Sequence, residues 1–262
     1  MKRSTDNTTD HVFGIHAVSA VLTADPGNII DICLQDDGRS NKRLGIIAER
    51  ARQACIPVRQ VSSRELDRYT DGMRHQGVLA RLEKPFSVTE TDLDDFLDRL
   101  EEPPFLLVLD GIQDPHNLGA CIRTANAAGV HAVIAPKNRA SGITPVVRKV
   151  ASGAVESIPF IQVTNLARVL RRLKAAGVWV IGADEKGQCS LFAADLSAAV
   201  ALVLGAEGKG LRRLTREQCD NIVHIPMEGS VESLNVSVAA GICIYEALRQ
   251  RMMSRENPLH KQ

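Results

Sequence analysis

Two short runs of the sequence are wholly apolar: residues 105–109 read FLLVL and residues 199–204 read AVALVL. A strand without polar side chains has to be buried on both faces, as in a parallel sheet that helices cover on each side. Segments with helical spacing of apolar residues alternate with further strand-like runs along the chain. This alternation predicts an α/β fold with a mostly parallel sheet in its C-terminal part.

The alternation is interrupted between residues 83 and 102, where two basic and eight acidic side chains give a balance of −6. Ser87 and Glu90 have the spacing of a capping box, and Leu93 and Leu97 begin an apolar stripe, which predicts a short helix. The Pro-Pro pair that follows forbids its continuation. We therefore predict a smaller N-terminal α/β domain over 11–82, an acidic linker with a short helix over 83–104, and a larger α/β domain over 105–252.

Composition excludes several classes of protein. Apolar residues make up 44% of the 262 residues, but no run approaches the ~20 that a membrane span needs. The first ten residues lack the apolar core of a secretory signal. Six scattered cysteines form no C-x-x-C pair, which argues against a zinc site or a disulfide framework and favours the reducing cytoplasm. We expect neither a metal nor a membrane partner.

The first of three motifs is residues 117–125, NLGACIRTA, directly after the predicted strand at 105–109. It opens a helix expected over 120–128, for which Asn117 is a plausible N-cap. Arg123 would then lie near the positive end of that helix, within reach of a phosphate. A solvated arginine on a surface helix is the alternative.

The other two motifs also follow predicted strands. Residues 205–210, GAEGKG, come after the run at 199–204, where the carboxyl edge of a parallel sheet offers a ligand crevice; a simple glycine turn explains them equally well. Residues 225–241 read IPMEGSVESLNVSVAAG, a glycine-containing loop before a helix of small residues. Capping by Ser233 or Asn235 alone would account for those two side chains.

Together, and in this order, the three motifs resemble those of the SpoU (TrmH-like) family of RNA 2'-O-ribose methyltransferases. The resemblance covers nearly the whole chain, including HQGVLAR at residues 75–81. It implies a C-terminal domain of the SPOUT class with a trefoil knot, which periodicity does not indicate. It also implies that the smaller domain is L30e-like and binds RNA.

The resemblance further implies the reaction and the residues that serve it. The expected activity is S-adenosylmethionine-dependent 2'-O-methylation of a guanosine in 23S rRNA by a cytoplasmic homodimer. Arginine almost never loses its proton, so Arg123 is expected to anchor phosphate and stabilise the oxyanion rather than act as a base. The matching catalytic residues are Asn117, Arg123, Glu207, Ser233 and Asn235, and the matching cofactor-binding residues are Gly205, Ile225, Met227 and Leu234.

Three alternatives stay open at this point. A transfer RNA 2'-O-methyltransferase shares the catalytic motifs, although its simpler members lack the N-terminal domain. A ribosome-assembly factor that binds RNA without catalysis would not need the polar residues of the three motifs. A small-molecule α/β enzyme leaves the N-terminal domain unexplained.

Overall fold

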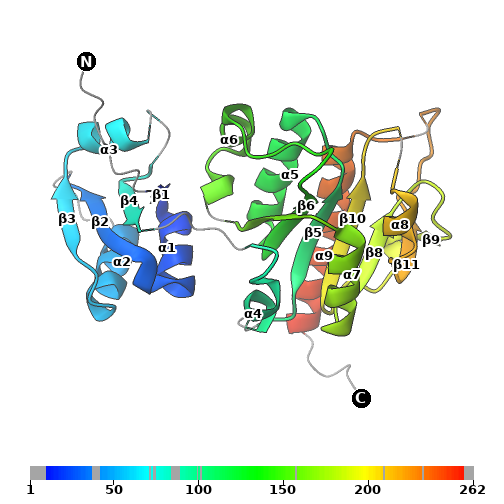
Figure 1. Cartoon of the computed structure of the whole chain (residues 1–262), viewed down its shortest axis with the longest axis horizontal. Helices are drawn as coiled ribbons and strands as arrows, with labels where there is room; N and C mark the ends of the chain where they lie inside the picture. Colours follow the sequence, from blue (N-terminus) through cyan, green and yellow to red (C-terminus); the bar gives the residue numbers. More distant parts are fainter. Residues whose placement is uncertain are drawn as a thin grey trace. The chain divides into compact units, whose positions relative to one another are not determined.

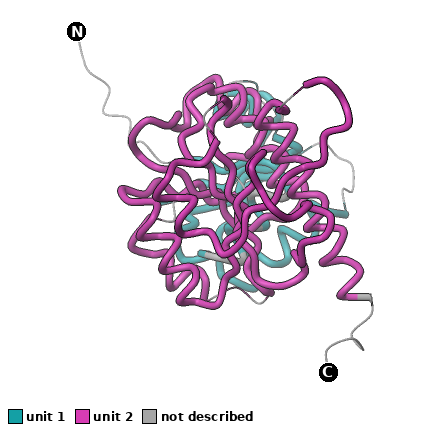
Figure 2. The backbone as a smooth tube through the Cα atoms, turned by 90° about the vertical axis from the view of Figure 1, so that its right-hand side faces the viewer, with its two compact units in different colours: residues 1–87 teal, residues 88–262 magenta. Residues whose placement is uncertain are grey.

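The computed structural model describes residues 10–36, 42–70, 72, 75–83, 89–98, 100, 102–156, 158–208, 210–231 and 233–256. The chain divides into two compact units, Met1–Ser87 and Val88–Gln262 (Figure 2). Ser87 of the predicted capping box lies outside the described residues. The boundaries predicted for an acidic linker between two domains stay a prediction.

Unit 1 is a four-stranded sheet with helices on both faces (Figure 1). The strand order is β1-β4-β2-β3, in which β4 runs antiparallel to both of its neighbours and β3 parallel to β2. One apolar face packs against α1 and α2, and a smaller apolar cluster lies under α3. Its elements are β1 (Asp10–Phe13), α1 (Ile15–Ala24), β2 (Ile29–Gln35), α2 (Lys42–Gln53), β3 (Val58–Val61), α3 (Ser63–Tyr69) and β4 (Val78–Leu82).

Unit 2 contains the remaining helices and strands. No helix among the described residues has the length and apolar content needed to cross a bilayer. The elements are α4 (Leu93–Asp98), β5 (Phe105–Asp110), α5 (Pro115–Ala127), β6 (Ala132–Pro136), α6 (Pro145–Ala151), β7 (Phe160–Val163), α7 (Leu166–Ala175), β8 (Trp179–Ala183), β9 (Cys189–Ser190), β10 (Val200–Gly205), α8 (Arg213–Arg216), β11 (Asn221–His224) and α9 (Val236–Glu256).

The sheet of unit 2 has seven strands in the order β7-β6-β5-β10-β8-β11-β9, and every neighbouring pair is parallel. Strand β10 lies between β5 and β8, with Val200 opposite Phe105 on one side and Trp179 on the other. The two apolar runs therefore form the centre of the sheet, and β5 is buried along its whole length. The predicted parallel α/β fold is confirmed.

Helices cover both faces of this sheet (Figure 1). Residues of α5, α6 and α9 pack into the core on one face. Those of α7 pack into the core on the other face, and α4 from the acidic segment adds Leu93 and Leu97 there. The two cores are separate, as expected for a sheet whose strands are apolar on both sides.

Helix α5 begins earlier than its sequence pattern predicts. Asp114 is the N-cap, because its Oδ1 accepts a hydrogen bond from the backbone N–H of His116 at 2.9 Å, and Pro115 takes the first helical position. Proline is well suited to that position, since its missing N–H would have no partner there. The prediction that Asn117 caps this helix is therefore wrong. Asn117 lies within the first turn, with its side chain buried.

Gly119 lets α6 pack closely against α5. A Cβ atom at this position would lie 2.7 Å from Cβ of Val150 and 3.0 Å from the carbonyl oxygen of Val147. We expect Gly119→Ala to lower the free energy of unfolding by about 1–2 kcal/mol, because the overpacking outweighs the gain in helix propensity. Urea denaturation followed by circular dichroism measures this change.

Gly241→Ala in α9 is the matched control. A Cβ atom there would meet Cγ2 of Thr124 in α5 at an ordinary 3.8 Å. This variant is expected to be neutral or more stable by up to about 1 kcal/mol. Equal stability changes in the two variants would contradict the close packing inferred at Gly119.

Candidate active site

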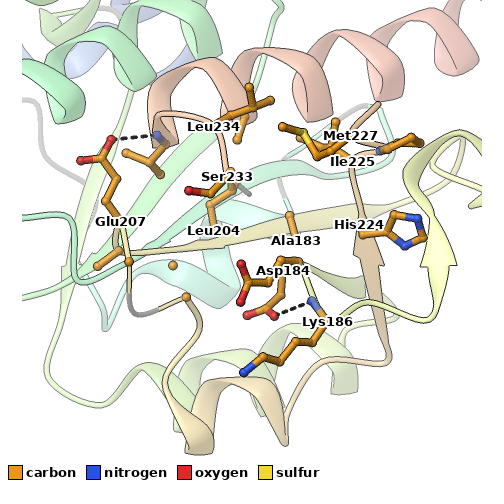
Figure 3. A pocket seen from close by; sticks show the side chains of 18 of the residues that line it. Ala183, Asp184, Lys186, Leu204, Glu207, His224, Ile225, Met227, Ser233 and Leu234 are labelled. Carbon is orange, nitrogen blue, oxygen red and sulfur yellow. Dashed lines mark hydrogen bonds between the residues drawn. The ribbon is translucent and has the colours of Figure 1, made fainter. Parts of the chain in front are cut away.

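A cavity of about 640 Å³ opens where the carboxyl ends of β8, β10 and β11 meet the segment before α9 (Figure 3). This volume is in the range of sites that hold a small organic ligand. Among the residues that the sequence singles out, six line the cavity: Gly205, Glu207, Ile225, Met227, Ser233 and Leu234.

The glycine-rich turn after β10 forms one wall of the cavity. Gly205 has no room for a side chain, because a Cβ atom would lie 2.1 Å from the carbonyl carbon of Gly210. Gly208 and Gly210 have positive φ angles of 70° and 60°, and the Gly210 N–H donates to the Ala206 carbonyl oxygen at 2.9 Å. The glycines therefore close a tight turn that projects Glu207 at the edge of the sheet.

Two buried aspartates hold the end of this turn. Asp110 ends β5, and its Oδ2 accepts a hydrogen bond from the Arg212 N–H at 3.0 Å. Asp184 follows β8, and its Oδ2 accepts from the Leu211 N–H at 3.3 Å while the carboxylate pairs with Arg216. Burial on its own would raise the pKa of Asp184. The hydrogen bonds from Arg216 and two backbone N–H groups have a larger, opposite effect, so the pKa lies below its ordinary value. Sequence reasoning missed both aspartates, although each comes at the end of a predicted strand.

Asn235 connects the three motifs. Its Nδ2 donates to Asn117 Oδ1 at 3.0 Å and to Glu207 Oε1 at 2.7 Å. Its Oδ1 accepts from the Ser237 N–H at 2.9 Å, which caps the start of α9, and the Val236 N–H donates to Glu207 Oε1 at 3.3 Å (Figure 3). Of the two residues that the sequence offers as caps, Asn235 is the one whose side chain caps α9, and it also bridges residues 118 and 28 positions away.

Arg123 is exposed on α5, outside this network and outside the cavity lining. It forms no ion pair with any carboxylate in the described part of the chain. An exposed guanidinium without a protein partner is free to bind a phosphate or another anion.

The cavity also contains polar residues that the motifs do not include. Lys186 and His224 line it, and the His224 ring contacts the Gly187 carbonyl oxygen through Nδ1 at 2.9 Å. Within the described ranges, no group of three or more His, Cys, Asp and Glu side chains is placed to hold a metal ion. Lys186 follows β8 and His224 ends β11, so their position at the carboxyl end of a strand is the signal that could have revealed them.

Two family models match the chain and together span most of it. Residues 104–245 match the model described as "SpoU rRNA Methylase family". Residues 11–88 match the model described as "RNA 2'-O ribose methyltransferase substrate binding". The first match contains the cavity and all three motifs, and the second corresponds to unit 1.

Individual proteins show the same similarity. A protein of Pseudomonas putida named 23S rRNA (guanosine-2'-O-)-methyltransferase RlmB is 49% identical over 246 residues, which cover 94% of this chain and 98% of the relative. The SpoU methyltransferase AviRb of Streptomyces viridochromogenes, solved in complex with the cofactor AdoMet, is 27% identical with a TM-score of 0.62 and covers 93% of this chain and 90% of that one. A TrmH/SpoU tRNA modifying enzyme of A. aeolicus is 28% identical with a TM-score of 0.55, and covers 63% of this chain and 85% of that one.

The hydrogen bonds that Asn235 Nδ2 donates to Asn117 and Glu207 predict the effect of replacing this nitrogen with an oxygen. Asn235→Asp replaces the Nδ2 donor with an oxygen that faces the acceptor oxygens of Asn117 and Glu207. We expect the free energy of unfolding at neutral pH to fall by about 1–2 kcal/mol, because two hydrogen bonds are lost and two carboxylates are brought together.

Asn221→Asp at the exposed start of β11 is the control for the same amide-to-acid change, and it should alter stability by less than about 0.5 kcal/mol. Chemical denaturation compares the two variants. If both were as stable as the unchanged protein, Asn235 would not hold the motifs together.

Proposed function

The chain belongs to the SpoU rRNA Methylase family, and we propose that it transfers a methyl group from S-adenosylmethionine to the 2'-oxygen of a guanosine ribose in 23S rRNA. The observation that carries this proposal is the similarity to the Pseudomonas putida enzyme along both units. The tRNA modifying enzyme covers a smaller share of the chain, which favours ribosomal over transfer RNA.

The cavity fits S-adenosylmethionine, a nucleoside joined to an amino acid. Among the described residues, the backbone N–H and C=O groups of Ile225, Met227 and Leu234 form no hydrogen bond with the rest of the protein. Unpaired backbone groups beside a cavity supply the donors and acceptors that a nucleoside needs. We assign these three residues and Gly205 to cofactor binding. When bound, the cofactor supplies an electrophilic methyl group on a positively charged sulfur.

The protein's own task is to orient a weakly acidic hydroxyl and to accept its proton or stabilise its charge. Glu207 receives hydrogen bonds from Asn235 and from the Val236 N–H, yet it has no cationic partner among the described residues. We assign it the role of accepting the hydrogen of the 2'-hydroxyl. Ser233 lines the same cavity and would contact the ribose, while Asn117 and Asn235 hold Glu207 in place.

Arg123 acts differently, because a guanidinium keeps its proton at any physiological pH. Its exposure and its lack of an ion pair suit it to bind the phosphate beside the target nucleotide. From there its charge would also stabilise the developing alkoxide.

Further properties of the family extend the proposal. Unit 1 would select the RNA as an L30e-like domain, and the sheet of unit 2 would carry a trefoil knot.

The exposed side chains of Val238, Tyr245 and Met252 recur every seven residues along α9, so we place a homodimer contact there. Sedimentation of the chain as a monomer at micromolar concentration would contradict the dimer. We also propose a cytoplasmic location, with 23S rRNA or an assembling ribosomal particle as the partner.

Replacement of Arg123 tests its assigned role. We expect Arg123→Ala to reduce the rate of methyl transfer by about 10²–10³-fold, the usual cost of losing one group that stabilises a developing negative charge. Affinity for S-adenosylmethionine, measured by calorimetry, should be unchanged, because Arg123 does not line the cavity. Arg123→Lys keeps the charge and should recover part of the rate. Wild-type turnover in the alanine variant would refute the assignment.

The substrate is tested by mapping 2'-O-methyl groups in total RNA from a strain that lacks the gene. We expect one guanosine of 23S rRNA to lose its methyl group, and expression of the wild-type gene, but not of Arg123→Ala, to restore it. Loss of a methyl group from transfer RNA, with 23S rRNA unchanged, would overturn the choice of substrate.

A further inference from the structure

One continuous stretch of unit 2 contains no carboxylate. Residues 115–155 include no Asp or Glu but five basic residues, namely Arg123, Lys137, Arg139, Arg148 and Lys149. The stretch forms α5, β6, α6 and the loops between them. It therefore differs from the chain as a whole, whose net charge is only +1.

Four of these cations, Arg123, Lys137, Arg139 and Lys149, are exposed and form no ion pair with a carboxylate of the described ranges. We call these four residues the basic surface. An exposed cation without a neighbouring carboxylate keeps its full attraction for an external anion.

The opposite face of the sheet is different. There, three of the four cations of α7 are paired: Arg168 with Glu90 at 2.5 Å, Arg172 with Asp94 at 2.9 Å, and Lys174 with Asp220 at 2.7 Å. The hydrogen bonds from Thr164 and Arg168 outweigh the effect of burial and hold the pKa of Glu90 at about 2, so it is charged at neutral pH. Among the described residues, most cations of α7 are thus paired with carboxylates, whereas the four cations of the basic surface are not.

Elements that bear the basic surface contact one another or the segment that follows the glycine-rich turn. Helix α6, which bears Lys149, packs on α5 at Gly119, one turn before Arg123. The loop that bears Arg139 is joined to the end of β5 by a 2.7 Å hydrogen bond from the Ser141 N–H to the Ile112 carbonyl oxygen. The Arg139 carbonyl oxygen also accepts from Arg212 at 3.4 Å, next to the glycine-rich turn. Arg123 and Lys149 therefore lie on helices that pack together, and Arg139 lies in a loop that contacts the segment after the glycine-rich turn.

We propose that the basic surface binds the phosphates of the RNA strand that flanks the target nucleotide. The proposal rests on the proposed function and extends it, because it assigns part of the RNA affinity to unit 2 rather than to unit 1 alone. Residues 115–155 contain no Phe, Tyr or Trp, so this stretch lacks the large aromatic side chains that form stacking platforms for bases. Contacts through phosphates alone make the binding independent of sequence and strongly dependent on salt.

Charge reversal on the basic surface tests the proposal. Arg139→Glu and Lys149→Glu change cations that lie outside the cavity lining. Arg171→Glu is the matched control, because Arg171 is an exposed cation of α7 on the opposite face, and within the described residues its side chain donates only to the Ala167 carbonyl oxygen. Binding of the full chain to an unmodified 23S rRNA transcript is measured over a series of salt concentrations, together with methylation rates and S-adenosylmethionine affinity.

Each reversal on the basic surface should weaken RNA binding about tenfold and reduce the slope of log affinity against log salt by roughly 1. The loss should appear in KM, with kcat recovered at saturating RNA. Arg171→Glu should bind within about twofold of the unchanged protein, and cofactor affinity should stay the same in all three variants.

Failure of the proposed RNA-binding surface and failure of the proposed function would give different results. If Arg139→Glu and Lys149→Glu bind RNA no more weakly than Arg171→Glu, the basic surface does not contact RNA and the proposal is wrong. A loss confined to kcat at saturating RNA would also overturn it, because binding would then be intact. If the unchanged protein binds the transcript but methylates neither ribosomal nor transfer RNA, the proposed function fails, while the binding comparison still decides the surface.

Discussion

The position of β10 between β5 and β8 is the constraint on which the site depends. Parallel ladders with this register bring the carboxyl ends of three strands to one edge, although the strands are separated by dozens of residues in the sequence. Asp110, Asp184 and Gly205 come together for this reason alone. In open α/β sheets, ligand crevices lie outside the carboxyl ends of the strands, and here the cavity opens at the ends of β8, β10 and β11.

Hydrogen bonds at this edge hold the glycine-rich turn after β10 in one conformation, so that it forms a wall of the cavity. Glycine-rich turns have high conformational entropy, so a turn that must present Glu207 accurately needs contacts that hold it. The carboxylates of Asp110 and Asp184 hold its far end, and Asn235 holds Glu207 itself. Interactions within the protein therefore occupy the carboxylates of Asp110, Asp184 and Glu207, and the backbone groups of the neighbouring loop are left for a ligand. This division is consistent with a site in which backbone atoms bind the cofactor and a few side chains act on the RNA.

The distribution of charge in unit 2 suits a site in which side chains act on RNA. The face covered by α7 uses its arginines and lysine to bind Glu90, Asp94 and Asp220, which also attaches the acidic segment to the unit. Residues 115–155, which form α5 and α6, contain no Asp or Glu. A polyanion approaching the unit is attracted to this stretch, which includes Arg123, and this bias is electrostatic and acts before any specific contact forms.

Local patterns in the sequence determined the α/β class, most helices and strands, and the three motifs, because the spacing of apolar residues reports which face of an element is buried. The start of α5 was misjudged because the choice of cap between Asp114 and Asn117 depends on a single proline. The sequence offers Asn235 as one of two possible helix caps. Its hydrogen bonds to Asn117 and Glu207 join segments that are far apart in the chain, and a sequence does not indicate which strand ends are neighbours. For the same reason the sequence does not indicate that Asp110 and Asp184 hold the glycine-rich turn. The tertiary structure alone decided these contacts, because they follow from the order of the strands in the sheet, which is set by the packing of the whole unit.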